Sequence, residues 1–132
     1  MSIPLNQKLL FFDGAMGTML QAAGLPAGDL PELWNLARPE AVAAVHSAYL
    51  AAGCDIMTAN TFGANALKLA GAGVSAEEVV AAAVALARNA VAESGRDAYV
   101  ALDIGPSGKL LRPLGDLEFE GAVSLFAQVV RA

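Results

Sequence analysis

Short apolar runs that stop abruptly at small or polar residues recur three times along the chain. Each run has the length of a buried β-strand, and the Gly, Asp, Thr and Asn residues after it favour a loop. Apolar residues at helical spacing lie between the runs, so the predicted order is β-α-β-α-β-α, an α/β fold of parallel strands with crossover helices. The carboxyl ends of parallel strands share one sheet edge, where α/β proteins build their active sites. The three transitions are residues 9–12 into 13–18, 54–57 into 58–63 and 99–102 into 103–108.

Turn and capping residues set the expected limits of the N-terminal elements. A first strand is predicted over about residues 8–13 and a short helix over 15–23, while the Gly and Pro residues of 24–38 indicate a loop. Pro39 suits the first turn of the next helix, and Gly53 suits its end. The buried face of this helix is predicted to be Val42, Val45, His46, Tyr49 and Leu50.

The C-terminal elements carry equally clear signals. Ser75 and Glu78 form the pattern of a capping box that opens a long Ala-rich helix, which runs to about Glu93 and is closed by Gly95. The third strand follows, and a last helix is predicted after Asp116. Its inner face is expected to be Phe119, Val123, Phe126 and Val130.

Two architectures begin with this order of elements: an open doubly wound sheet and a closed eight-stranded barrel. The sequence stops at residues 129–132 inside a helical pattern, without a Gly or Pro terminator and after only three strands. The pattern therefore predicts that the 132 residues are an excerpt from a longer α/β protein, either a truncated product or half of a split enzyme.

Composition narrows the class of protein. With 56% hydrophobic and 16% charged residues, the chain is predicted to be folded. A net charge of −5 with eight Lys and Arg residues argues against nucleic acid or an anionic membrane as a partner. No apolar segment reaches the roughly 18–20 residues of a membrane span, and residues 1–8 lack the features of a signal peptide. The single cysteine, Cys54, excludes an intrachain disulfide and predicts a cytoplasmic location.

Taken one at a time, the polar residues leave alternatives open. The loop that begins at Asp13 is similar to a Gly-rich phosphate loop but lacks the G-x-G-x-x-G spacing and a Walker lysine, so a small domain for a phosphorylated ligand is one alternative. Asp13 and Asp103, at strand ends, either contact a ligand or fix loop backbones. His46 is interpreted as a core histidine rather than a catalytic one, and Cys54 as a small buried hydrophobe. Trp34 either covers the mouth of the site or anchors its own loop.

In combination, four motifs in a fixed order resemble the N-terminal part of the homocysteine S-methyltransferase family. The resemblance runs from about Lys8 to the end of the chain, and residues 113–117 are most similar to the homocysteine-binding module of cobalamin-dependent methionine synthases. The motifs are Phe12-Asp13-Gly14-Ala15-Met16-Gly17-Thr18, Glu32-Leu33-Trp34-Asn35-Leu36, Ala52-Gly53-Cys54-Asp55-Ile56-Met57-Thr58-Ala59-Asn60-Thr61-Phe62-Gly63-Ala64 and Asp103-Ile104-Gly105-Pro106-Ser107-Gly108-Lys109-Leu110-Leu111.

The resemblance implies a (β/α)8 TIM barrel, of which residues 1–132 supply the first three β/α units as a partial homocysteine-binding domain. In the family, a zinc ion at the barrel mouth binds the thiol of homocysteine, and the thiolate takes a methyl group to give methionine. Methylcobalamin is the methyl donor in the methionine synthase branch. The implied activity is therefore that of a cytoplasmic methyltransferase in methionine biosynthesis.

The same resemblance implies which residues contact homocysteine. Asp13 would hold the ammonium group, and backbone amides near Gly14 would hold the carboxylate. Residues after the second strand would line the mouth beside the thiol, and residues after the third would shape the last loop. The implied substrate-binding residues are Asp13, Gly14, Asn60, Thr61, Phe62, Gly105 and Pro106.

The chain departs from the family at the metal. Family members bind zinc through three cysteines, one after a later strand and two in a Gly-Gly-Cys-Cys-Gly motif, and these positions do not exist here. Cys54 stands where the family has a small residue, so we expect no metal ligand and no methyl transfer by this chain alone. Three strands also leave open sheet edges, which predicts self-association or binding of a complementary C-terminal chain. A non-catalytic binding or assembly module is the remaining alternative.

Overall fold

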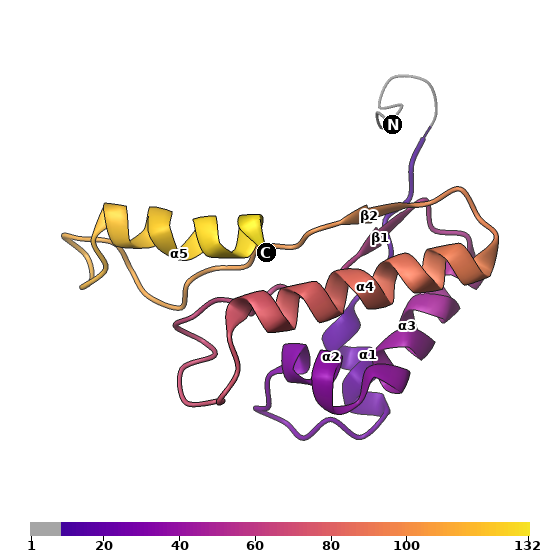
Figure 1. The fold of residues 1–132 in the computed structure, drawn as a ribbon, viewed down its shortest axis with the longest axis horizontal. Helices are drawn as coiled ribbons and strands as arrows, with labels where there is room; N and C mark the ends of the chain where they lie inside the picture. Colours follow the sequence, from indigo (N-terminus) through magenta and orange to yellow (C-terminus); the bar gives the residue numbers. More distant parts are fainter. Residues whose placement is uncertain (1–8) are drawn as a thin grey trace.

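The computed structural model describes residues 9–132 and contains a two-stranded parallel sheet with helices packed against it. In Figure 1 the helices α1–α4 lie below the sheet, and α5 follows a long connection that leads away from it. None of the helices in the described part of the chain has the length and apolarity to cross a membrane. The elements are α1 (Met16–Ala22), the 3-10 helix η1 (Pro31–Leu33), α2 (Trp34–Ala37), α3 (Pro39–Ala52), β1 (Ile56–Thr58), α4 (Ala76–Ser94), β2 (Tyr99–Ala101) and α5 (Phe119–Arg131).

Strand β1 has β2 on one side and residues 11–13 on the other. Strand β2 pairs with β1 in parallel along its whole length, whereas Phe12 forms only an isolated parallel bridge with Ile56. The amide of Asp13 donates to the carbonyl of Ile56 at 3.0 Å. The predicted strand over residues 8–13, whose first residue lies outside the described part, is therefore wrong in extent. Within residues 9–132 this segment pairs with β1 alone, and its exposed apolar side chains have no second strand to pack beside.

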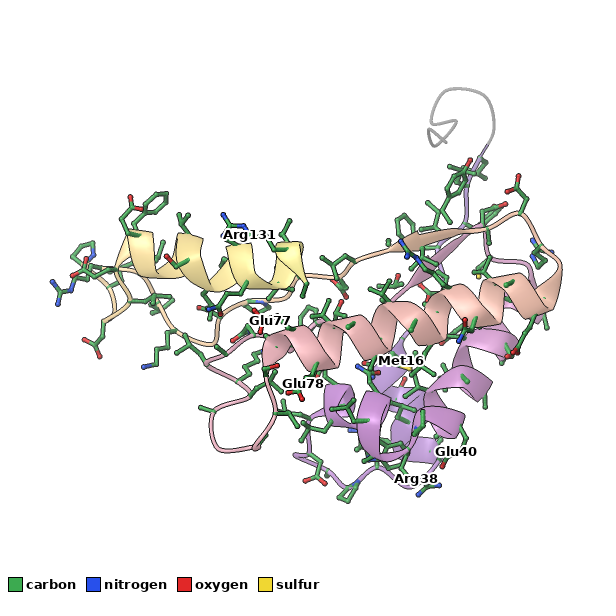
Figure 2. All side chains as sticks on the ribbon, in the orientation of Figure 1. Met16, Arg38, Glu40, Glu77, Glu78 and Arg131 are labelled. Carbon is green, nitrogen blue, oxygen red and sulfur yellow. The ribbon has the colours of Figure 1, made fainter. Side chains whose placement is uncertain are left out.

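Helix α4 connects β1 to β2, which confirms the predicted crossover between parallel strands. The Ser75 hydroxyl accepts a hydrogen bond from the Glu78 amide at 3.2 Å, and the Glu78 carboxylate accepts one from the Ser75 amide at 2.8 Å. This capping box places Glu77 and Glu78 in the first turn of α4 (Figure 2). Gly53 and Gly95 end α3 and α4 in the left-handed conformation, with φ values of 103° and 67°. These predicted limits are confirmed.

The prediction that residues 24–38 form a loop is wrong for their second half. The short helices η1 and α2 occupy residues 31–37, and Pro31 takes the first position of η1. Glu32 and Asn35, both buried, form hydrogen bonds to residues that follow β1. Contacts with a distant part of the chain thus stabilise two short helices that the local sequence pattern does not indicate.

The predicted inner face of α5 is also wrong. Two sets of apolar residues recur at helical spacing on this helix, and the set with smaller side chains is the buried one. The sequence pattern shows that apolar residues recur at helical spacing, but packing against α4 determines which of the two sets is buried. The buried residues are Ala122, Leu125 and Val129, whereas Phe119, Val123 and Val130 are exposed and Phe126 is half-buried.

The core explains three residues whose roles the sequence left open. His46 is fully buried in α3 with its Nδ1 2.9 Å from the Met57 sulfur, so it is a core histidine. Cys54 is buried in the apolar cluster between α3, β1 and α4, as predicted. Trp34 packs on the cluster of α1 and α3, and the Arg38 guanidinium lies 5.0 Å from its ring centre. Trp34 therefore anchors its own segment.

Candidate ligand pocket

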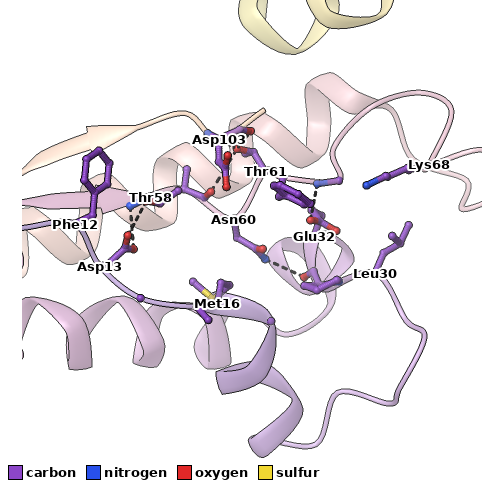
Figure 3. A pocket seen from close by; sticks show the side chains of 17 residues that line it. Phe12, Asp13, Met16, Leu30, Glu32, Thr58, Asn60, Thr61, Lys68 and Asp103 are labelled. Atoms are coloured by element: carbon purple, nitrogen blue, oxygen red, sulfur yellow. Dashed lines mark hydrogen bonds between the residues drawn. The ribbon is translucent and has the colours of Figure 1, made fainter. Parts of the chain in front are cut away.

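A pocket of about 390 Å³ opens where β1, β2 and residues 11–13 end (Figure 3). The three strand-end loops meet at one edge, as the sequence predicted, and the segment before α2 closes a further side. The lining residues are Phe12, Asp13, Gly14, Ala15, Met16, Gly17, Leu30, Pro31, Glu32, Thr58, Ala59, Asn60, Thr61, Phe62, Gly63, Lys68 and Asp103.

Asp13 joins the first loop to the end of β1. Its Oδ2 accepts a hydrogen bond from the Thr58 amide at 2.9 Å, and its Oδ1 accepts one from the Thr58 hydroxyl at 2.6 Å (Figure 3). Of the two roles left open for Asp13, fixing the loop is therefore directly visible. Both carboxylate oxygens are engaged within the protein, and each keeps lone-pair capacity toward the pocket.

Thr61 joins the second loop to the third. Its buried hydroxyl donates to the Asp103 carbonyl at 2.8 Å and accepts from the Asp103 amide at 3.1 Å. One side chain thus satisfies both backbone groups of Asp103. This arrangement fixes the backbone at the end of β2 and leaves the Asp103 carboxylate free of these bonds.

Asn60 joins the second loop to the segment before α3. Its side-chain amide donates to the Pro31 carbonyl and to Asn35 Oδ1, both at 2.9 Å. Asn35 donates in return to the Asn60 carbonyl at 2.8 Å. Asn60 and Thr61 therefore line the pocket, and their polar groups form hydrogen bonds that hold its walls.

Glu32 contributes a buried carboxylate to the pocket wall. Its Oε1 accepts a hydrogen bond from the Gly63 amide at 2.7 Å, whereas Oε2 has no hydrogen-bond partner among the described residues. A Cβ at position 63 would lie 2.9 Å from Oε2, so the glycine permits this close approach. A buried carboxylate oxygen without a hydrogen-bond donor, such as Glu32 Oε2, is unusual in a folded protein and indicates that a ligand or a water molecule binds in the pocket.

Phe62 projects a half-exposed ring at the pocket, with the Lys68 ammonium 5.1 Å from the ring centre. The Gly105 amide donates to the Phe62 carbonyl at 3.0 Å, and a Cβ at Gly105 would lie only 2.4 Å from that oxygen. Gly105 therefore supports the pocket from behind without lining it. Pro106 is exposed and does not line the pocket either.

Gly14 lines the pocket where the first loop meets α1. A Cβ at this position would lie 2.7 Å from the Tyr49 hydroxyl oxygen. That hydroxyl donates to the Ala15 carbonyl at 3.1 Å and so holds the loop against α3. The structure brings Asp13, Gly14 and the residues after β1 together at one pocket.

Cys54 and His46, the side chains best suited to bind zinc, lie in the core rather than at the pocket. Burial raises the pKa of the Cys54 thiol, and the negative charge of Asp13 raises it further. Burial lowers the pKa of His46, and attraction to Asp13 opposes this shift. Residues 9–132 contain no group of three His, Cys, Asp or Glu side chains placed to hold a metal ion. The residues present therefore do not fit the zinc site that the resemblance implies.

Three charged lining residues were not among the predicted substrate contacts: Glu32, Lys68 and Asp103. Asp103 ends an apolar strand as Asp13 does, and this repeated position was a usable signal. Glu32 lies in a quoted motif, but nothing in its local pattern indicates burial. Lys68 follows no periodic pattern, and it reaches the pocket because Asn65 Oδ1 accepts its amide hydrogen bond at 3.1 Å and fixes the turn.

Known proteins are similar to this chain in sequence and in fold. Methionine synthase of Mycobacterium tuberculosis (strain ATCC 25618 / H37Rv) is 35% identical over 126 residues, covering 87% of this chain and 10% of that protein. Methionine synthase of Mycobacterium leprae (strain TN) is 40% identical over 67 residues, covering 46% of this chain and 6% of that protein. The chain thus spans a tenth or less of these curated relatives.

A solved structure shares the fold. The metallated form of the homocysteine methyltransferase MmuM from Escherichia coli superposes with a TM-score of 0.67 at 28% identity, over 79% of this chain and 40% of that one. Its oxidized form gives a TM-score of 0.65 at 29% identity, over 80% of this chain and 40% of that one. A family model described as homocysteine S-methyltransferase matches residues 10–132. The chain belongs to the homocysteine S-methyltransferase family.

Proposed function

We propose that this chain forms the amino-acid-binding part of a methyltransferase that converts homocysteine to methionine. Family membership supports the class of reaction. The pocket at the strand ends carries the proposal for the site, because side chains of one loop fasten the backbone of the next. A pre-formed pocket with few, fixed polar groups suits a small polar ligand.

In this proposal, Asp13 and the amides near Gly14 face the amino-acid end of homocysteine. Asn60 and Thr61 are buried and act by positioning the loop that carries Phe62. The ring of Phe62 covers the thiol end of the ligand. Gly105 supports Phe62 from behind, and Gly105 and Pro106 together shape the third loop.

The proposed reaction forms one bond and breaks another. The thiol loses its proton, the sulfur bonds to the methyl carbon, and the electron pair of the broken donor–methyl bond stays with the donor. We propose methylcobalamin as that donor, because the chain is similar to methionine synthases. Since the described residues do not fit a zinc site, we assign this chain no part in activating the thiol, and we propose that it is inactive alone.

We also propose that the barrel of the family is completed by a complementary chain or by a second copy. Large apolar side chains are exposed beside the sheet and on α5, among them Leu9 and Phe119 at 76% and 67%. Patches of this kind mark interaction surfaces. Light scattering over a concentration series tests the idea, and a monomer that persists at high concentration, with no binding to a co-expressed C-terminal segment of the family, argues against it.

Isothermal titration of the full chain with L-homocysteine under reducing conditions tests the proposed ligand. We expect saturable binding that Asp13→Asn weakens and that the exposed substitution Asp97→Asn leaves unchanged. Absence of binding by both L-homocysteine and L-methionine contradicts the proposal. The phosphate-ligand alternative is disfavoured because Asp13, Glu32 and Asp103 line the pocket and repel an anion. We propose a cytoplasmic location, which cell fractionation tests.

A further inference from the structure

Three carboxylates line the pocket, and two of them are already engaged. Asp13 accepts hydrogen bonds from Thr58 on both oxygens, at 2.6 Å and 2.9 Å. Glu32 accepts one from Gly63 at 2.7 Å, and its other oxygen is shielded from solvent. A ligand that approaches from the pocket therefore meets Asp13 with both oxygens engaged and Glu32 with one oxygen engaged.

Asp103 differs from both. Thr61 binds its amide and its carbonyl, so its backbone is fixed at the end of β2. Its carboxylate has no hydrogen-bond or ion-pair partner among residues 9–132, and the residue is half-buried. Figure 3 shows Asp103 beside Thr61 at the pocket. The Asp103 carboxylate is thus available to accept a hydrogen bond from a ligand in the pocket, and its backbone is held in place by Thr61.

A second, independent feature points to the same kind of ligand. Glu32 is 3% exposed, and its Oε2 has no partner among the described residues although it borders the same pocket. A buried carboxylate oxygen without a donor is costly, and a cationic or strongly donating ligand relieves that cost. Lys68 supplies no such relief here, because its ammonium lies over the Phe62 ring and forms no ion pair within the described residues.

We propose that Asp103 accepts a hydrogen bond from the ammonium group of the amino-acid ligand, and that Thr61 is the residue that positions Asp103. This proposal rests on the proposed function and adds a determinant of specificity to it. An ammonium group has three N–H donors, so it uses acceptors beyond those near Asp13. The contact is an ion pair strengthened by a hydrogen bond, and no covalent step is involved.

The test compares two thiols that differ at the ammonium group. The full chain is titrated calorimetrically with L-homocysteine and with 4-sulfanylbutanoate, which lacks the amino group. We expect Asp103→Asn to weaken L-homocysteine binding about tenfold or more, the usual range for a hydrogen bond to a charged group. Binding of 4-sulfanylbutanoate should stay unchanged or become stronger, because the substitution removes a negative charge that repels this anion. Asp97→Asn, an exposed residue before β2 and at the other end of that strand, is the matched control.

Thr61 variants separate positioning from folding. Thr61→Val removes the hydroxyl and should reproduce the selective loss, whereas Thr61→Ser keeps the hydroxyl and should restore most of the affinity. If Asp103→Asn does not fold, Asp103→Ala serves the same comparison, with circular dichroism as the check on folding. Equal weakening of both thiols, or no weakening of either, overturns the proposal for Asp103 alone. If the unmodified chain binds neither thiol nor L-methionine, the proposed function fails together with it.

Discussion

Asn60 donates its side-chain amide to Asn35 Oδ1 at 2.9 Å, while Asn35 donates back to the Asn60 carbonyl at 2.8 Å. Both residues are buried. The pair ties α2 to the end of β1, although the two residues are 25 positions apart in the sequence. Together with the Glu32–Gly63 bond, it stabilises the short helices before α3.

Asn35→Ala and Asn60→Ala should each destabilise the chain by about 2–3 kcal/mol, because each leaves a buried partner unsatisfied. The double variant should cost less than the sum, because both single variants break the same bond between Asn60 Nδ2 and Asn35 Oδ1. Urea denaturation measures all three. Asn89→Ala, on the exposed face of α4, is the control and should stay within about 0.5 kcal/mol of the unmodified chain.

Gly63→Ala should destabilise the chain because its Cβ would lie 2.9 Å from the Glu32 carboxylate. We expect a loss of about 1–3 kcal/mol, typical of overpacking in a core. In the background of Glu32→Ala, which removes the obstacle, the same glycine substitution should cost much less. Gly121→Ala in α5 is the control, since a Cβ there meets ordinary contacts. Equal costs of Gly63→Ala in both backgrounds contradict the clash.

Stability should fall as the pH is lowered through the ordinary pKa of histidine. Burial lowers the pKa of His46 in the folded chain, so between that value and about 6.5 the unfolded chain binds more protons than the folded one. For one group the slope is at most about 1.4 kcal/mol per pH unit. His46→Met removes the titrating group and should flatten the profile between pH 7.5 and 5, measured by urea denaturation. An unchanged profile in this variant would assign the slope to other groups.

Cys54 should resist thiol reagents in the folded chain. It is 6% exposed, and burial raises the pKa of its thiol, which reduces the reactive thiolate. Labelling with a chromogenic disulfide should be slow in buffer and fast in urea, and it should report one thiol per chain. Fast labelling in buffer would show that the cluster around Cys54 opens readily. A Ser47→Cys variant, exposed on α3, provides the matched reactive control.

The exposed apolar residues of α5 should promote association. Lysine at both Val123 and Val130, which are 47% and 63% exposed, should lower the apparent mass at high concentration. Ser124→Lys adds a charge to the same helix at an exposed polar position and should change the mass little. Multi-angle light scattering distinguishes these cases. A similar effect from all three lysines would point to net charge rather than to the apolar surface.

Local signals predicted the parts of the fold that depend on local physics. The limits of α3 and α4 follow from Gly53, Ser75, Glu78 and Gly95, whose capping roles need only neighbours in sequence. The helices over residues 31–37 were missed because buried bonds to residues after β1 stabilise them. Helix α5 has two apolar faces, and which of them is buried depends on its packing against α4, which the local sequence does not reveal.

At the site, too, the sequence predicted what depends on local pattern and missed what depends on contacts between distant residues. The repeated strand endings predicted where the pocket lies, because parallel strands bring their ends together. The sequence did not reveal that Asp13 binds Thr58 or that Thr61 binds Asp103, since these contacts span 45 and 42 positions. Glu32 was missed for the same reason: its burial depends on Gly63, which is 31 positions away.

The backbone around Phe62 is held from both sides, by Glu32 on the Gly63 amide and by the Gly105 amide on the Phe62 carbonyl. The ring itself takes no part in either bond. The backbone at position 62 is therefore fixed independently of its side chain, so the side chain can be substituted without loss of these two hydrogen bonds. A library confined to residues 62 and 68, whose side chains contact each other at the pocket, is therefore an economical start for altering which thiol the pocket accepts.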